Sequence, residues 1–349
     1  METMNALVNT TPGHAEIQRV PIPSCGKGEV LVRVQSAALC GTDLHILEWD
    51  SWAQGAGLRL PFILGHECCG DVVSTGEDVS GLRAGDKVAV ETHVPCGRCD
   101  RCLNGEQHIC HNLTLFGIHM NGCFAEYAIV PAICIRKIPE AIDYDFGSLM
   151  EPIGTAFRAV FESHVGGCNV LILGYGPIGL FAVASAKTLG AHQVTACDVS
   201  ASRLDIARRV GADRLLNPQE TDIRALILND THSYGVDVII EASGNAAALQ
   251  ESIRLLRKGG TVALIGLPGQ PVAFDIGKDI VFKEAKVTGF HGRRMFSTWS
   301  RVERLLSTNR LNVGPVMTHV LPLEQWREGV RLARLGEACK VIFHPAGHA

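Results

Sequence analysis

The feature that most constrains this fold is a glycine-rich turn between an apolar strand and an apolar helix. Residues 169–173 have a strand pattern, residues 178–189 have a helical pattern, and the turn between them reads Gly-Tyr-Gly-Pro-Ile-Gly. Gly174 permits the tight turn, Gly176 lets a pyrophosphate approach the backbone, and Gly179 lets the helix pack against the strand. The helix N-terminus offers free N–H groups and the positive end of its dipole to phosphates. The turn therefore predicts a βαβ unit that binds a dinucleotide.

An acidic residue after the next strand indicates which dinucleotide binds. Asp198 follows Gly176 by about 20 residues, where a carboxylate accepts the ribose hydroxyls of NAD and repels the 2′-phosphate of NADP. Arg203, in the following helix, argues the other way, because arginine can hold a 2′-phosphate. We expect NAD because Asp198 is present. The alternative is that the glycines serve only the turn and that Asp198 caps a helix.

Strands and helices continue to alternate after the turn. Between residues 151 and 290 this alternation predicts a parallel sheet with helices on both faces. Before residue 150 short β-branched runs separated by glycines are typical of an all-β module. A chain of 349 residues exceeds one comfortable core, so we expect two domains. The expected strands are residues 30–34, 71–73, 87–90, 124–130, 169–173, 194–197, 236–240, 261–265 and 286–289, and the expected helices are residues 178–189, 201–210, 246–256, 299–306 and 323–335.

Composition excludes several classes of protein. The chain is 46% hydrophobic and 19% charged with a net charge of −4, which argues against disorder, nucleic-acid binding and an acidic membrane surface. The first 25 residues have no apolar stretch typical of a secretory signal, and residues 170–191 are better explained by strand, turn and helix than by a membrane span. Thirteen cysteines in such a chain indicate a reducing compartment, and we expect the cytoplasm.

Four clustered cysteines predict a structural metal site. Cys96, Cys99, Cys102 and Cys110 form the spacing C-x2-C-x2-C-x7-C. Four thiolates satisfy tetrahedral zinc and leave no open position, which is typical of a structural site. The rival is an iron–sulfur cluster, but the bacterial ferredoxin run has a shorter last gap followed by proline. Here His111 follows the last cysteine, so zinc is favoured.

A second group of ligand-type residues predicts a catalytic zinc. Cys40, His66, Glu67 and Glu151 offer a thiolate, an imidazole and carboxylates, and three protein ligands would leave a position open for substrate. Neighbouring residues of an extended chain point to opposite sides, so His66 and Glu67 share an ion only if the backbone bends. Otherwise Glu67 alternates with water, and Glu151 is the other candidate oxygen ligand or a proton-relay group.

Each of these residues also has a purely structural explanation: Cys40 as a buried thiol, His66 as a buried histidine with its hydrogen bonds made, and Glu67 as a helix-capping acid. Thr42 and His45 suit a proton relay, because a hydroxyl can pass a proton and an imidazole titrates near neutral pH. Taken singly, they are a turn hydroxyl and a surface histidine. Their occurrence together with a dinucleotide motif favours zinc as a Lewis acid that lowers the pKa of an alcohol, whose hydride then passes to NAD⁺.

These motifs together resemble the zinc-containing medium-chain dehydrogenases over nearly the whole chain. The matching segments are Cys-Gly-Thr-Asp-Leu-His, Gly-His-Glu, the four-cysteine lobe at about residues 93–113 and the glycine turn. Residues 48–54, Glu-Trp-Asp-Ser-Trp-Ala-Gln, and residues 292–299, Gly-Arg-Arg-Met-Phe-Ser-Thr-Trp, resemble segments of one branch, the L-threonine 3-dehydrogenases. Those enzymes convert the secondary alcohol of L-threonine to 2-amino-3-oxobutanoate. A polyol dehydrogenase, or an NAD-binding zinc protein without catalysis, are the alternatives.

The resemblance implies an α/β architecture with a GroES-like domain (residues 1–150 and 291–349) and a Rossmann domain (residues 151–290). It implies a homotetramer with two zinc ions per subunit. Catalytic zinc would lie at Cys40, His66 and Glu67, with Glu151 as alternate ligand or relay, and Thr42 and His45 would relay the proton. The residues implied to contact NAD are Gly174, Gly176, Ile178, Gly179, Asp198, Arg203, Ile265, Gly266, Leu267, Phe290 and His291.

Two segments depart from the branch and bear on the substrate. Residues 154–158 read Gly-Thr-Ala-Phe-Arg where Gly-Asn-Ala-Val-His is common, and residues 117–122 also differ from several members. A zwitterionic substrate needs a partner for its carboxylate and one for its ammonium. Arg293 or Arg294 could hold the carboxylate as a bidentate partner, and Glu151 could face the ammonium. The alternative for the two arginines is a solvated pair.

Overall fold

The computed structural model describes residues 2–345, which form two compact units. The first unit comprises the described residues of Met1–Glu151, Arg294–Ser307 and Met317–Ala349, and the second comprises Pro152–Arg293 and Thr308–Val316. Domain boundaries at residues 150 and 291 stay a prediction. Of residues 2–345, no helix is both long enough and apolar enough to cross a membrane.

The first unit is built on a seven-stranded sheet. Strands β10, β6, β5, β3, β18 and β17 follow one another in that order, and β9 also pairs with β3. A second sheet has the order β2-β1-β4, and β7 pairs with β8. The strands are β1 (Thr3–Thr11), β2 (His14–Pro21), β3 (Glu29–Ala38), β4 (Phe62–Ile63), β5 (Glu67–Thr75), β6 (Lys87–Val90), β7 (His93–Val94), β8 (Thr114–Leu115), β9 (Tyr127–Pro131), β10 (Ile135–Lys137), β17 (Met317–Pro322) and β18 (Lys340–His344).

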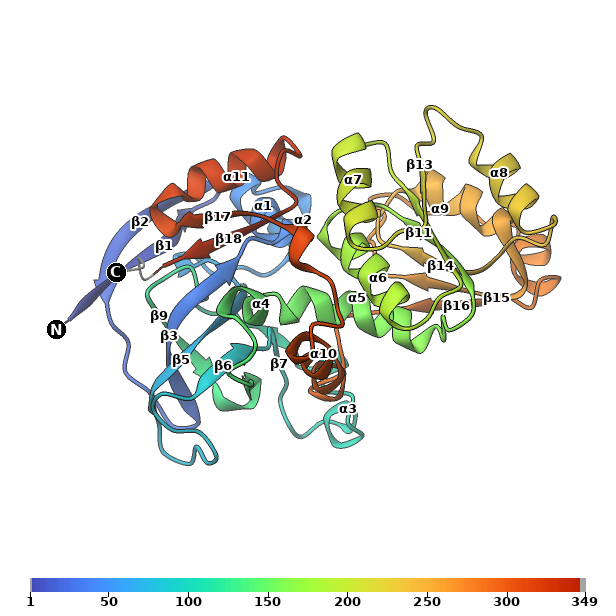
Figure 1. The fold of residues 1–349 in the computed structure, drawn as a ribbon. Coiled ribbons are helices and arrows are strands. Elements are labelled where there is room, and N and C mark those ends of the chain that lie inside the picture. Colours follow the sequence, from blue (N-terminus) through green and yellow to red (C-terminus); the bar gives the residue numbers. More distant parts are fainter. Residues whose placement is uncertain (1, 346–349) are drawn as a thin grey trace. The chain divides into compact units, whose positions relative to one another are not determined.

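The end of the chain completes this sheet. Strand β18, red in Figure 1, pairs antiparallel with the blue strand β3 and parallel with β17. Buried side chains such as Val32, Val34, Phe124 and Phe343 form its core. The helices of the unit are α1 (Gly41–Glu48), α2 (Ser51–Gly55), α3 (Asp100–Leu103), α4 (Tyr144–Ser148), α10 (Ser297–Ser307) and α11 (Trp326–Arg334).

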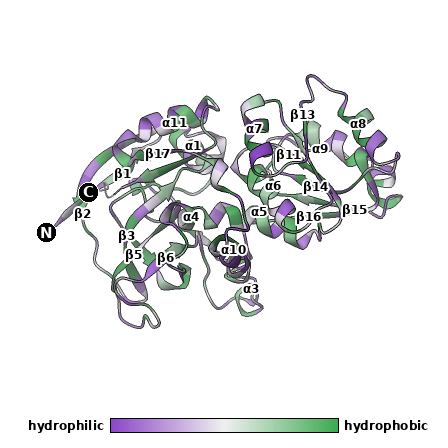
Figure 2. Ribbon diagram, viewed as in Figure 1, coloured by the Kyte–Doolittle hydropathy of each residue, from purple (hydrophilic) through white to green (hydrophobic). Residues whose placement is uncertain are grey.

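The second unit is a six-stranded parallel sheet with the order β13-β12-β11-β14-β15-β16. Its central strands β11 and β14 are mainly hydrophobic in Figure 2, because both faces of such a sheet are covered by helices. The strands are β11 (Asn169–Leu173), β12 (Gln193–Cys197), β13 (Arg214–Leu216), β14 (Val236–Glu241), β15 (Leu256–Leu264) and β16 (Lys286–Gly289), and the helices are α5 (Met150–Glu162), α6 (Pro177–Thr188), α7 (Ala201–Arg209), α8 (Ile223–Asp230) and α9 (Ala246–Ser252).

These observations confirm the α/β class, with a β-rich first unit and a six-stranded parallel sheet flanked by helices in the second. One expected element was wrong in extent. The helix expected over residues 246–256 ends at Ser252, a 3₁₀ turn (Ile253–Leu255) follows, and β15 begins at Leu256. The apolar residues of that turn pack in the core of the second unit. A short apolar run of this kind fits either the end of a helix or the start of a buried strand, so the sequence pattern does not distinguish the two. The N-terminal hairpin β1–β2 and helix α8 were not anticipated.

Candidate active site and metal centres

Cys40, His66 and Glu67 come together in the first unit. Each offers one ligand atom, and these three atoms lie within 4.8 Å of one another. Cys40 follows β3 and caps α1, and Glu67 begins β5, opposite Ala38 of β3. The antiparallel pairing of β3 and β5 therefore places the two loops at one end of the sheet.

The backbone bends just before His66, as sharing of one ion by neighbouring residues requires. Gly65 has φ of 92°, and a Cβ atom there would lie 2.5 Å from the ring of Phe124. Only glycine combines this conformation with this close approach. His66 thus lies outside the strand that Glu67 begins, and both side chains reach the same point.

Asp43 contacts two of the three residues of this cluster, Cys40 and His66. The carboxylate is fully buried, and its Oδ2 accepts a hydrogen bond of 2.9 Å from the N–H of Cys40. Its Oδ1 lies 3.5 Å from Nδ1 of His66. Burial lowers the pKa of His66, but the negative charges of Asp43 and Cys40 outweigh burial and raise that pKa well above its usual value. These surroundings thus favour positive charge on the imidazole. Sequence reasoning assigned no role to Asp43, although an acid at this position of a capping box is a recognisable signal.

Glu67 is a buried carboxylate paired with a buried lysine. Nζ of Lys340 lies 2.5 Å from Oε2 of Glu67 and also donates to the carbonyl of Leu39 at 2.8 Å. Burial raises the pKa of Glu67, Lys340 opposes this effect, and Glu151 adds to it. Lys340 was missed from sequence because it lies on β18, at the far end of the chain. A lysine at the start of an apolar strand was the available signal.

Thr92 connects Glu151 to the cluster. Its hydroxyl donates to the carbonyl of His66 at 3.0 Å and to Oε1 of Glu151 at 3.3 Å. Glu151 lies in the first turn of α5. Thr92 therefore links the Glu151 carboxylate to the backbone of His66, and the role of Glu151 as an alternate ligand or relay group stays a prediction.

The two expected relay residues differ in their surroundings. Oγ1 of Thr42 lies 3.8 Å from Sγ of Cys40. The His45 side chain is 53% exposed, and its Nδ1 lies 2.5 Å from Oδ2 of Asp50. Asp50 also caps α2 by accepting from the N–H groups of Trp52 and Ala53, and these bonds together with His45 lower its pKa. Asp50 therefore stays ionised and fixes the imidazole, a role that the sequence analysis did not assign.

The four-cysteine lobe forms a closed cluster. The sulfur atoms of Cys96, Cys99, Cys102 and Cys110 lie within 4.8 Å of one another. Backbone N–H groups of Arg98 and Cys99 lower the pKa of Cys96 to about 6, whereas burial raises the pKa of Cys102 to about 12. Helix α3 carries Cys102, and Gly97, with φ of 71°, turns the chain between the first two cysteines.

The donor sets fit zinc at both sites. Four thiolates suit a closed tetrahedral ion, and a thiolate, an imidazole and a carboxylate suit an open one. At the second set, Oε1 of Glu67 is buried without a hydrogen-bond partner among the described residues. A buried anionic oxygen is costly unless a cation satisfies it, so this orphaned atom is itself evidence for a metal.

The glycine turn of the second unit has the geometry that a pyrophosphate needs. Gly174 has φ of 82°, and a Cβ atom on Gly179 would overlap the carbonyl of Gly174. A Cβ atom on Gly176, the N-cap of α6, would meet nothing within 4 Å, so its backbone is open to a ligand. The Asp198 carboxylate accepts from the N–H groups of Tyr175 (2.9 Å) and Ser200 (2.8 Å). These bonds hold the acid at the end of β12, beside the turn.

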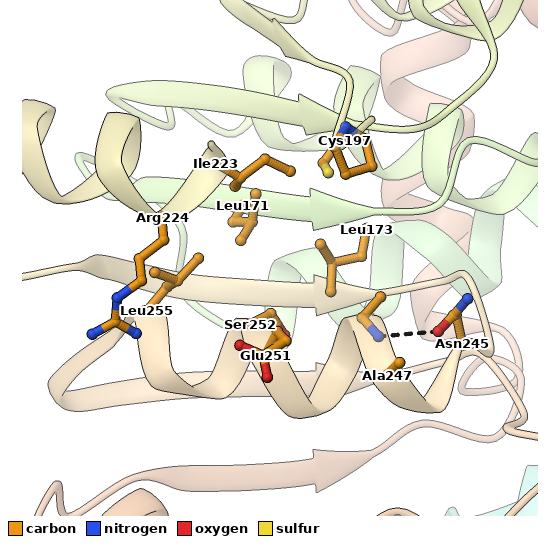
Figure 3. Close-up of a pocket in the computed structure, with 12 residues that line it drawn as sticks. Leu171, Leu173, Cys197, Ile223, Arg224, Asn245, Ala247, Glu251, Ser252 and Leu255 are labelled. Carbon is orange, nitrogen blue, oxygen red and sulfur yellow. Dashed lines mark hydrogen bonds between the residues drawn. The ribbon is translucent and has the colours of Figure 1, made fainter. Parts of the chain in front are cut away.

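A pocket of about 390 Å³ adjoins the carboxyl ends of β11 and β12 (Figure 3). Its lining is mostly apolar, and Leu173, Cys197, Pro218 and Asn245 lie at its rim near those strand ends. Open parallel sheets bind ligands at this edge. Asn245 is the N-cap of α9, and its side chain accepts a hydrogen bond from the N–H of Ala248.

The remaining expected cofactor residues lie at element ends of the same unit. Ile178 and Arg203 are in the first turns of α6 and α7. The other five follow the last two strands: Ile265, Gly266 and Leu267 after β15, and Phe290 and His291 after β16. The Leu267 side chain is 84% exposed.

The structure corrects one alternative for the paired arginines. Arg293 is fully buried, and its Nη1 donates to Oγ1 of Thr155 at 3.4 Å. Arg293 and Arg294 are therefore not a solvated pair. Arg294 is half-buried, which leaves it the more accessible of the two for a substrate carboxylate.

Comparison with known proteins agrees with this geometry. Residues 26–140 match the alcohol dehydrogenase GroES-like domain, and residues 177–308 match the zinc-binding dehydrogenase family. The chain is 41% identical to L-threonine 3-dehydrogenase of Pyrococcus horikoshii over 98% of this chain and 99% of that protein. This chain belongs to the zinc-containing medium-chain dehydrogenase family that includes the L-threonine 3-dehydrogenases.

One further sequence relative and one solved structure show how widely the family's fold and sequence are shared. L-threonine 3-dehydrogenase of Bacillus subtilis is 40% identical over 95% of both chains. The structure of an alcohol dehydrogenase from Thermotoga maritima superimposes with a TM-score of 0.90 at 32% identity, covering 99% of this chain and 100% of that one. The fold is thus shared widely, whereas the higher sequence identity is to threonine enzymes.

Replacement of Lys340 by methionine tests the buried ion pair. The change leaves the Glu67 carboxylate buried without its cation, which should cost about 3–5 kcal/mol of unfolding free energy. Urea unfolding at neutral pH measures this loss. The matched control is Lys27→Met, because the Lys27–Asp78 pair is exposed and should contribute at most about 1 kcal/mol. Equal stability of the two variants would show that the Glu67–Lys340 pair is unimportant to the fold.

Proposed function

We propose that this protein oxidises the secondary alcohol of L-threonine to L-2-amino-3-oxobutanoate with NAD⁺ as the hydride acceptor. The observation that carries the reaction class is the convergence of Cys40, His66 and Glu67. The substrate follows from full-length identity of about 40% to relatives named L-threonine 3-dehydrogenase. The residues assigned below to catalysis and binding are part of this proposal.

The chain's own residues divide the work of the reaction. Cys40 and His66 would hold zinc, with Glu67 or Glu151 as the oxygen ligand, and such an ion would supply the Lewis acidity that favours loss of the hydroxyl proton. That proton leaves through Thr42 and His45, whose ring is fixed by Asp50. Bound NAD⁺ would supply the hydride acceptor, and loss of the hydride from the carbinol carbon would leave a ketone.

Recognition of threonine needs opposite charges at its two ends. Arg294 is half-buried and offers a guanidinium fork to the carboxylate. Glu151, held by Thr92, offers negative charge to the ammonium group. A polyol carries neither charge, so Arg294 and Glu151 would not favour its binding.

Cofactor choice rests on Asp198. Its two oxygens accept hydrogen bonds from backbone N–H groups at the end of β12, where the same carboxylate would also accept hydrogen bonds from the ribose hydroxyls of NAD. We further propose a homotetramer in the cytoplasm. All four residues of the edge strand β16 are exposed, and an unpaired sheet edge of this kind is suited to pairing with a second copy.

A substrate panel tests the proposed reaction. We expect NADH formation, followed by absorbance, with L-threonine and NAD⁺, much slower rates with NADP⁺, and much slower rates with sorbitol. The reason is that only an amino acid pairs with both Arg294 and Glu151. Faster turnover of sorbitol than of L-threonine would assign the protein to the polyol enzymes instead.

Metal counting tests the two proposed zinc sites separately. We expect two zinc ions per chain by elemental analysis, one for each cluster. Cys40→Ser should retain one ion and lose turnover, because the reactive ion is removed. Cys99→Ser should also retain one ion but melt at a lower temperature, because the lobe loses its metal.

The matched control for both variants is Cys25→Ser, because Cys25 belongs to neither cluster. This variant should keep both ions and full turnover. Undiminished turnover of Cys40→Ser would refute the assignment of the reactive metal, whatever its zinc content.

A further inference from the structure

Arg158 of helix α5 makes an unusual set of contacts within the second unit. The residue is 8% exposed, and its Nη1 donates to the carbonyl of His291 at 3.2 Å and lies 3.5 Å from the carbonyl of Gly292. Its guanidinium lies 5.3 Å from the ring centre of Phe290. Its Nε donates to Oε1 of Glu162 at 3.1 Å. One side chain thus engages three consecutive residues, 290–292.

The segment 290–292 leaves the carboxyl edge of the parallel sheet. The N–H of Phe290 donates to the carbonyl of Leu264 at 2.8 Å, which continues the pairing of β15 with β16. Gly292 then turns the chain with φ of 56°. The backbone contacts from Arg158 therefore fall on His291 and Gly292, just beyond the last hydrogen bond of strand type.

Arginine is suited to this task by its chemistry. A guanidinium carries several N–H donors in one plane and a flat face that stacks on an aromatic ring. It can therefore bind carbonyls, a carboxylate and Phe290 at once. The Glu162 carboxylate, one helical turn further along α5, compensates the charge of the buried cation.

A second residue of α5 contacts the same segment. Oγ1 of Thr155 accepts from Nη1 of the fully buried Arg293. Thr155 and Arg158 are also the two positions at which residues 154–158 carry different polar groups from the pattern Gly-Asn-Ala-Val-His. The two polar residues of α5 that differ from this pattern, Thr155 and Arg158, therefore both contact residues 290–293.

We propose that Arg158 is a positioning residue for the nicotinamide end of the cofactor. It holds residues 290–292 in the conformation in which Phe290 and His291 receive the nicotinamide. This inference rests on the proposed function, with Phe290 and His291 among the residues that the family resemblance implies contact NAD. Arg158 acts through the backbone of the segment, so it affects NADH binding and leaves both zinc sites and the adenosine end of the cofactor unchanged.

Paired binding measurements test this role. Titration of the full-length protein gives Kd for NADH and for ADP-ribose, which lacks the nicotinamide. For Arg158→Met we expect Kd for NADH and KM for NAD⁺ to rise about tenfold, because about one charged hydrogen-bonding group is lost. Kd for ADP-ribose, KM for L-threonine and zinc content should stay unchanged. The matched control is Arg208→Met, because Arg208 forms an exposed pair with Asp205 in the same unit.

The other possible results contradict either the positioning role of Arg158 or the proposed function. Equal weakening of NADH and ADP-ribose would mean that Arg158 serves only the fold, and no weakening of either would mean that it does not position the segment. Should Arg158→Met not fold, Arg158→Lys keeps the charge without the planar fork and must weaken NADH but not ADP-ribose. Failure of the unaltered protein to bind NADH would instead refute the proposed function itself.

Discussion

The active centre depends on a buried excess of negative charge that needs a cation. Asp43 and Glu67 are fully buried, Cys40 brings a thiol beside them, and Lys340 is the buried cation paired with Glu67. The negative charges of Asp43 and Cys40 raise the pKa of His66 despite its burial. Enclosing such groups without compensation would cost several kcal/mol for each unpaired ion, so a bound metal is the natural solution.

The fold supplies this arrangement through strand pairing. Pairing of β3 with β5 brings Cys40 and Glu67 together, and the conformation of Gly65 turns His66 toward them. Pairing of β18 with β3 then delivers Lys340 from the end of the chain. The second unit uses the other type of sheet for its task, since parallel strands expose all their carboxyl ends along one edge. The glycine turn, Asp198 and the apolar pocket lie at that edge.

Local motifs were predictable because their physics is local. The glycine turn needs three glycines between a strand and a helix, and the four-cysteine lobe needs its ligands within one short loop, so both are visible in the sequence. The requirement that the chain bend at His66 also followed from adjacency alone. By contrast, Lys340 and Arg158 act on residues far along the chain, and no period or spacing encodes those contacts. The early end of helix α9 was missed for a related reason, since burial rather than periodicity starts β15 at Leu256.

The most direct test of the account is a crystal structure of the active, zinc-loaded protein with anomalous diffraction collected at the zinc edge. We predict two anomalous peaks per chain, one within the four-cysteine lobe and one from an ion that is bonded to both Sγ of Cys40 and the imidazole of His66. Fully active protein with a peak in the four-cysteine lobe alone would contradict it.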